Sequence, residues 1–138
     1  MIRLPLRDTK TNYLAGFWTW VRLMANDDYA GAVDALLWDR QPPWSAETLR
    51  ETVTTFFGGD EPWAVVVPNN RLIRVVEDSA DWEPPRTTSP GWLLAQIPLT
   101  TRPADALADD IPLMGLAASF FVGSHEGANV LELEIFHL

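Results

Sequence analysis

The sequence predicts an α+β domain in which three N-terminal helices pack in a curved, mainly antiparallel sheet. Three observations predict this class. Apolar residues recur at helical spacing in the first half of the chain, whereas the second half carries β-branched runs and alternation. The 138 residues, 47% of them hydrophobic and 21% charged, are enough for one domain with its own core. We therefore expect residues 1–138 to form a single domain.

The first expected helix covers about Thr11 to Ala25. Five apolar residues at three- and four-residue spacing mark its buried face: Leu14, Phe17, Trp18, Val21 and Met24. Further apolar residues widen that face, so we expect burial on more than one side. The run Asn26-Asp27-Asp28 then provides a stop and a new N-cap, because short polar side chains bind the free N–H groups of a helix start.

Two shorter helices are expected next. One covers about Asp28 to Leu37 and is ended by Gln41-Pro42-Pro43, because proline cannot continue a helix. The other begins after Ser45, a good N-cap, and places Glu47 near the positive end of the helix dipole. Gly58-Gly59 ends it, because glycine accepts the left-handed conformation of a C-cap.

The first strands are expected after this helix. Trp63–Val67 is short and β-branched, and Pro68-Asn69-Asn70 predicts a turn into a second strand, Arg71–Val76, in a hairpin. Glu77–Pro90 is acidic and proline-rich, which predicts a surface loop. Trp92–Leu99 is the next expected strand. A connection over 100–112 follows, with room for one helical turn at 104–108.

Two long strands complete the predicted sheet. Leu113–Val122 is apolar, although its Ala-Ala-Ser centre is also compatible with a helix. A hairpin connection over Gly123–Ala128 leads to a last strand, Asn129–His137. Apolar and acidic residues alternate there, with Leu131, Leu133 and Ile135 on one side and Glu132 and Glu134 on the other. Alternation of this kind predicts one buried and one solvated face.

The charge distribution excludes some partners. The net charge is −9, and the segment from Pro103 to Leu138 has no Lys or Arg but six acids: Asp105, Asp109, Asp110, Glu126, Glu132 and Glu134. Such a field repels nucleic acids and anionic membranes and attracts a basic protein. We expect a basic protein partner and neither nucleic acid nor membrane. The alternative is that the acidity only maintains solubility.

The absence of cysteine removes disulfides, thiolate nucleophiles and thiolate zinc sites. The N-terminal MIRLPLRDTK lacks the apolar segment of a signal peptide, and no apolar run approaches the length of a membrane span. We therefore expect a cytoplasmic protein. No P-loop, dinucleotide fingerprint or EF-hand spacing occurs, so neither a cofactor nor a metal is expected.

The order of these elements resembles a known fold. A Trp-rich first helix, the segment Trp20–Leu37 with Asp-Asp-Tyr-Ala at the start of its second helix, and the closing strand pair resemble the nuclear transport factor 2-like superfamily. The resemblance implies a cone in which the sheet wraps the first helix and leaves a pocket at the open end. Members of this superfamily include isomerases, cyclases and dehydratases, but also adaptors and toxin-neutralising immunity proteins. Many are homodimers packed through the sheet, so the resemblance implies that any of these functions or assemblies is compatible with the chain. Fold alone does not choose among them.

The catalytic candidates are His137 and Asp110. Alternation places His137 with the apolar face of the last strand, where a neutral imidazole could act as a general base. The alternative is an exposed strand end. The pair Asp109-Asp110 could face the cone opening, or it could cap and solvate a loop. His125 lies between two glycines, which predicts a solvated hairpin tip, and Tyr13 and Tyr29 are expected to pack in the core.

The binding candidates are acids and tryptophans at the margins of loops: Glu132, Glu134, Asp109, Trp82 and Trp92. Tryptophans in such places can anchor a partner, or they can close the ends of a core. Two hypotheses for function follow. One is a non-enzymatic protein-binding module, of the immunity or adaptor type, with an acidic face for a basic partner. The other is a small-molecule-binding enzyme that uses the cone pocket; a cone filled by Trp18, Phe56 and Phe121 would contradict it.

Overall fold

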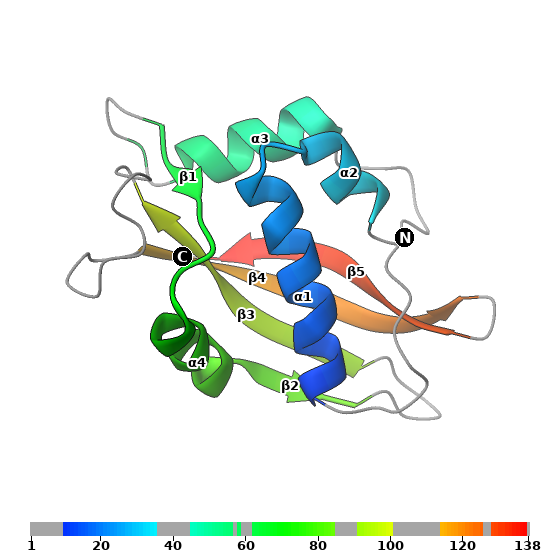
Figure 1. Cartoon of the computed structure of the whole chain (residues 1–138). Coiled ribbons are helices and arrows are strands. Elements are labelled where there is room, and N and C mark those ends of the chain that lie inside the picture. The colour runs from blue at the N-terminus through cyan, green and yellow to red at the C-terminus, as the bar shows by residue number, and fades with distance from the viewer. Residues whose placement is uncertain are drawn as a thin grey trace.

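Helices precede most of the sheet along the chain. The computed structural model describes residues 10–35, 45–56, 58, 62–84, 91–100, 114–125 and 128–137, and only the backbone at 114–115, 123–125 and 128–137. The elements occur in the order α1 (Lys10–Ala25), α2 (Tyr29–Asp34), α3 (Ala46–Thr55), β1 (Ala64–Val65), α4 (Asn70–Ser79), β2 (Asp81–Glu83), β3 (Gly91–Thr100), β4 (Met114–His125) and β5 (Ala128–His137) (Figure 1). The predicted α+β class and its three leading helices are confirmed.

The sheet is antiparallel and has the strand order β1-β3-β4-β5. β2 pairs with the same edge of β3 as β1 does, but near its other end. Ala64 of β1 stands opposite Thr100, whereas Asp81 of β2 stands opposite Leu94. The two short strands, which flank α4 in the chain, therefore both pair with one long strand.

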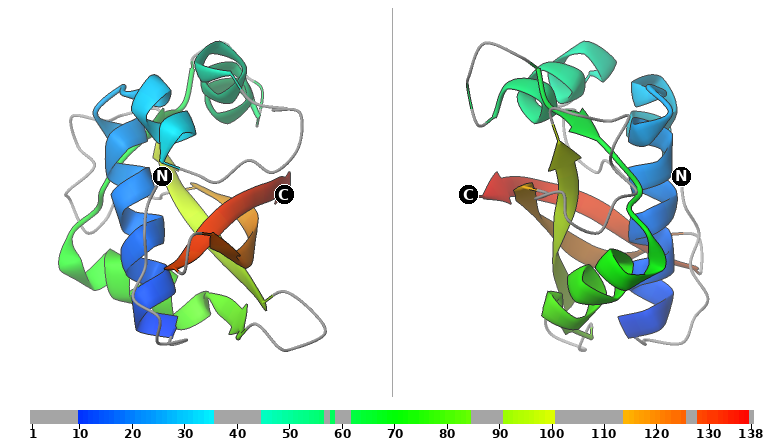
Figure 2. Two further views of the ribbon diagram at one scale, coloured as in Figure 1. Left: turned by 90° about the vertical axis from the view of Figure 1, so that its right-hand side faces the viewer. Right: turned by 60° about the vertical axis from the view of Figure 1, so that its left-hand side comes forward.

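Helix α1 lies in the middle of the described helices. α1 crosses the sheet, α2 and α3 lie beyond the C-terminal end of α1, and α4 lies near its N-terminal end beside β2 (Figures 1 and 2). Among the elements that the structure describes, no helix covers the opposite face of the sheet. One sheet face therefore packs in the core, and the described elements leave the other face without a helix.

The core lies between α1 and this covered sheet face. Alternate residues of two neighbouring strands are buried: Leu93, Ala95, Ile97 and Leu99 on β3, and Leu116, Ala118, Phe120 and Val122 on β4. The Phe120 ring meets Trp20 edge-on, at 5.3 Å and 89°, and Phe17 at 6.0 Å and 77°. Such edge-to-face pairs contribute about 0.5–1.5 kcal/mol each beyond their buried area. Aromatic rings therefore fill the space beneath the first helix.

The predicted hairpin of Trp63–Val67 with Arg71–Val76 is wrong. Residues 70–79 form helix α4, and β1 pairs with β3 instead. The Asn69 side chain accepts a hydrogen bond from the Leu72 amide at 3.0 Å, so this residue caps a helix rather than turning a hairpin. Ile73 and Val76 pack against the core while Arg74 is exposed, which is the period of a helix despite the β-branched content.

Two predicted loops are also shorter than expected. The segment Glu77–Pro90 contains the end of α4 and strand β2, which pairs with Leu94–Trp92; residues 85–90 lie outside the described part of the chain. The connection Gly123–Ala128 is largely strand, with His125 directly opposite Ala128. His125 therefore belongs to β4 by its backbone. The helical turn expected at 104–108 and the stretch Leu36–Leu37 lie outside the described residues.

A β-bulge interrupts the last strand pair. Phe120 stands opposite Leu133, but the preceding residue, Ser119, stands opposite Ile135. Glu134 is thus an extra residue, and the unbroken alternation predicted for Asn129–His137 is wrong at this point. A bulge arises where two residues of one strand oppose one of the other, and it shifts the register of everything beyond it by one position.

Candidate functional site

The candidate site lies at the turn where α1 ends and α2 begins. The Asp27 amide donates to the Met24 carbonyl at 3.0 Å, and the Asp28 amide donates to the Leu23 carbonyl at 2.8 Å. This pair of bonds is the Schellman ending of a helix, and it requires a left-handed residue that is usually glycine. Here that residue is Asp27, with φ of 61°. A non-glycine residue in this conformation costs of the order of 1 kcal/mol or more.

The next residue, Asp28, begins α2. Its carboxylate accepts a hydrogen bond from the Gly31 amide at 2.8 Å, which satisfies a free N–H group of the helix start. A Cβ atom at Gly31 would collide with this carboxylate, so the cap and the glycine depend on each other. Two consecutive aspartates therefore make a tight turn between α1 and α2.

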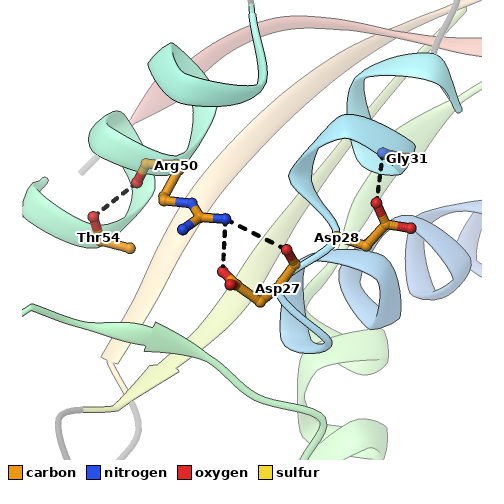
Figure 3. Close-up of polar contacts among 5 residues, drawn as sticks. All are labelled: Asp27, Asp28, Gly31, Arg50 and Thr54. Atoms are coloured by element: carbon orange, nitrogen blue, oxygen red, sulfur yellow. Dashed lines mark hydrogen bonds and ion pairs between the residues drawn. The ribbon is translucent and has the colours of Figure 1, made fainter.

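Arg50 of α3 binds this turn through the Asp27 side chain and carbonyl. Its Nη2 atom lies 3.0 Å from Asp27 Oδ1 and donates to the Asp27 carbonyl at 3.5 Å (Figure 3). Ser45 positions the helix, because its side chain accepts from the Thr48 amide at 3.1 Å. The Arg50 and Asp27 side chains are 51% and 72% exposed. Exposed ion pairs of this kind contribute only about 0.2–1 kcal/mol.

Tyr29 forms the floor of the site. The Arg50 guanidinium carbon lies 5.1 Å from the centroid of its ring, in a cation–π contact. The side chain is 4% exposed, and among the described residues none forms a hydrogen bond with its hydroxyl. Burial raises the pKa of Tyr29 above its ordinary value, the nearby Asp27 raises it further, and Arg50 partly lowers it. The hydroxyl is therefore neutral at physiological pH.

Two adjoining hollows share this group of residues. One, of about 510 Å³, is lined by Asp27, Tyr29 and Arg50 together with Asp28, Glu47 and Glu51. The other, of about 550 Å³, shares Asp27, Tyr29, Arg50 and Thr54 with the first, and its remaining lining is apolar and includes Met24, Trp63 and Val65. Both are within the usual size range of ligand sites. We call the first the acidic hollow and the second the apolar hollow.

The acidic hollow carries a net charge of −3, from four carboxylates and one guanidinium. Only Asp27 pairs with Arg50, and the Glu47 and Glu51 side chains form no ion pair with any residue that the structure describes. A concave surface lined by one sign of charge attracts ligands of the opposite sign. The chemistry of this hollow therefore suits a cationic group and not an anion.

The acidic residues predicted as candidates lie far along the chain from the α1–α2 turn and the acidic hollow. Asp109 and Asp110 lie outside the described residues. Glu132 stands opposite Phe121 in the sheet, Glu134 is the extra residue of the bulge, and His137 stands opposite Ala117. Because the bulge intervenes, the alternation that grouped His137 with Leu131 and Leu133 does not hold along the whole strand.

The two predicted tryptophans belong to opposite faces of the sheet. Trp82 stands opposite the buried Leu93, and its ring lies 5.8 Å from that of Tyr13 on the core side. Trp92 stands opposite Phe121 and donates its indole N–H to Glu83 at 2.9 Å. Trp82 thus closes the core, whereas Trp92 lies beside the half-exposed Phe121 on the face without a helix.

The group formed by Asp27, Asp28, Tyr29 and Arg50 was only partly predictable from the sequence. Asp27 and Asp28 were expected as a stop and a cap, and Tyr29 was expected to be buried; both expectations are confirmed. Arg50 was not identified, because its partner lies 23 residues away and no local pattern connects them. An aspartate at the position where a helix usually takes glycine was the available signal.

Within the described ranges, no group of three or more His, Asp or Glu residues is arranged to hold a metal ion. None of the described helices has the length and apolar character needed to cross a membrane.

Fold and site together define an α+β protein with an acidic, tyrosine-floored hollow between its leading helices. No protein-family model matches the chain, and no curated protein or solved structure is significantly similar to it.

Proposed function

We propose that this chain is a non-enzymatic protein-binding module, of the adaptor or immunity type, that accepts a basic segment of a partner protein. The observation that carries the proposal is the acidic hollow, where Glu47 and Glu51 are not neutralised by a described residue. The net charge of −9 supports it, because a field of that sign accelerates the approach of a basic partner. A nuclear transport factor 2-like fold is part of the proposal.

The filled interior favours binding over small-molecule catalysis. An enzyme of the cone type needs an open pocket between the first helix and the sheet, and here Phe17, Trp20 and Phe120 pack together between these elements with mutual ring contacts, which supports a filled interior. Phe121, one of the three residues whose presence inside the cone would have contradicted the enzyme hypothesis, is instead 39% exposed on the other sheet face. That exposed ring, beside Trp92, supports the further proposal of a homodimer packed through the sheet.

An oligo-arginine peptide tests the site with two matched variant pairs. Glu47→Gln with Glu51→Gln removes two charges from the acidic hollow, and Asp78→Asn with Asp81→Asn removes two from exposed positions on α4 and β2. We expect the first pair to weaken binding about three- to tenfold and the second less than twofold, because each exposed charge contact contributes about 0.2–1 kcal/mol. Equal losses in both pairs would contradict a localised site.

The partner itself can be sought with the same variants. Pull-down from the native host should recover a basic protein with the unaltered chain and the Asp78→Asn/Asp81→Asn variant, and much less of it with the Glu47→Gln/Glu51→Gln variant. Recovery that is insensitive to the glutamates would argue against the acidic hollow as the contact surface.

A further inference from the structure

We infer that Asp27 and Tyr29 form a guanidinium-selective subsite, which Arg50 of this chain occupies in the free protein and which an arginine side chain of a partner enters in its place. This inference rests on the proposed function, because it names the group that the acidic hollow recognises. The present occupant defines the chemistry of the subsite, since Arg50 makes there the contacts that an incoming arginine would make.

The contacts favour a guanidinium over an ammonium group. Asp27 provides two acceptors, its Oδ1 atom at 3.0 Å and its carbonyl oxygen, and the Tyr29 ring provides a face at 5.1 Å. A flat, delocalised guanidinium can stack on a ring while its edge donates to oxygen atoms, whereas an ammonium group is a compact, strongly hydrated charge. The subsite therefore discriminates by shape as well as by charge.

Tyr29 presents both its ring and its hydroxyl to the subsite. The side chain is 4% exposed, it lines both hollows, and no described residue forms a hydrogen bond with its hydroxyl. The hydroxyl is not among the described atoms that are sealed from solvent without a hydrogen bond, so its oxygen can be reached from outside. An entering guanidinium would offer several N–H donors to this oxygen.

Arg50 is held loosely enough to leave. Its ion pair with Asp27 is exposed on both sides, so the closed arrangement is favoured only about fivefold over the open one. Arg50 lines both hollows, which leave room for its side chain to move. Glu47 lies three residues earlier on α3, on the same helix surface, and can take over the displaced charge.

The conformation of Asp27 is consistent with this role. Glycine would end α1 without strain at φ of 61°. Asp27 adopts this conformation with backbone strain, but it places a carboxylate near Tyr29. Backbone strain of this type gathers at binding sites. The contact with Arg50, being weak, offsets the strain only in part.

The inference is tested with arginine amide as the probe, lysine amide as the matched control, and the ring resonances of selectively labelled tyrosine as the signal. The chain has two tyrosines, and the fully buried Tyr13 serves as an internal reference for Tyr29. In Arg50→Ala we expect arginine amide to shift the Tyr29 resonance and to bind about five- to tenfold more tightly than to the unaltered chain. Lysine amide should bind at least about threefold more weakly than arginine amide.

Two further variants make the result decisive. Adding Asp27→Asn to Arg50→Ala should remove the arginine-dependent shift, and Arg50→Gln repeats the test if the alanine variant is poorly folded, as judged by an altered Tyr13 resonance. Equal affinity in Arg50→Ala and the unaltered chain, or equal shifts with arginine and lysine amides, would overturn the subsite. Loss of peptide binding in Glu47→Gln/Glu51→Gln without any gain in Arg50→Ala would leave the proposed function standing and this inference refuted.

Discussion

The Nη2 atom of Arg50 lies 3.0 Å from Oδ1 of Asp27, and this ion pair joins α3 to the turn between α1 and α2. The backbone of Asp27 has a left-handed conformation, with φ of 61°. One residue therefore combines a stabilising contact with a strained backbone. Since the two effects have opposite signs and similar sizes, substitutions at Asp27 can separate them.

Three substitutions of Asp27 should give three different stabilities. Asp27→Asn keeps the tolerance for left-handed backbone but loses the charge, and should cost about 0.2–1 kcal/mol. Asp27→Gly loses the charge but relieves about 1 kcal/mol of strain, so it should be nearly neutral or slightly stabilising. Asp27→Ala loses the pair and keeps the strain, and should cost about 1–2 kcal/mol. Urea unfolding measures all three.

Salt gives the control for this series. The difference between the unaltered chain and Asp27→Asn should shrink at high ionic strength, because an exposed ion pair is screened. The difference between Asp27→Gly and Asp27→Ala should not change, since backbone strain is independent of salt. A glycine variant less stable than the alanine variant would show that the left-handed conformation is not the source of the strain.

Asp28 and Gly31 should behave as a coupled pair. Asp28→Ala removes the cap of α2 and should cost about 1 kcal/mol. Gly31→Ala alone places a Cβ atom against the Asp28 carboxylate, so displacement of the cap should cancel its gain in helix propensity. In the Asp28→Ala background the same change should stabilise by up to about 1 kcal/mol. A double-mutant cycle measures the coupling, and additive effects would contradict it.

Tyr29 should make stability depend on alkaline pH. Its pKa is raised in the folded state by burial and by Asp27, so the folded protein holds this proton more tightly than the unfolded chain does. The resulting stabilisation is complete below the unfolded pKa of about 10 and is lost as pH rises through the higher folded value. Urea unfolding of Tyr29→Phe against the unaltered chain, over a series of alkaline pH values, should show a shallower decline in the variant. Parallel declines would exclude this titration.

The position of Arg50 has a related consequence. Because its guanidinium lowers the pKa of Tyr29 in the folded state, Arg50→Gln should raise the pH at which the Tyr29 ring ionises. Tyrosinate absorbance in the near ultraviolet follows this ionisation, with Tyr29→Phe as the reference that contains only Tyr13. An unchanged or lower midpoint in Arg50→Gln would mean that the guanidinium does not act on the ring.

Local patterns predicted the helices better than the pairing of the strands. The bounds of α1 and the caps Asp28 and Ser45 follow from apolar spacing and from short polar side chains, which act within a turn of themselves. The helix at Asn70–Ser79 was missed because Ile73, Val75 and Val76 favour strands locally, whereas the Asn69 cap and the core contact decide for a helix. β-propensity is weak against such context.

The site shows the same limit. Asp27 and Tyr29 are close in sequence, and their roles as helix stop and buried ring were predictable. Arg50 reaches them only after α3 has folded back, and the bulge at Glu134 changes the register of His137 by a single residue. Neither a long-range ion pair nor a bulge leaves a period in the sequence that can be counted.

Phe120 and Phe121 are neighbours on β4 and should respond in opposite ways to truncation. Phe120 is fully buried against Trp20 and Phe17, so Phe120→Ala should cost about 3–5 kcal/mol. Phe121 is 39% exposed on the face without a described helix, so Phe121→Ala should cost about 1 kcal/mol or less. Urea unfolding compares them, and equal losses would mean that a further layer buries Phe121. Light scattering at several concentrations shows whether that layer is a second copy of the chain. A dimer packed through the sheet should dissociate in Phe121→Ala, whereas the control variant Asp78→Asn should leave it intact.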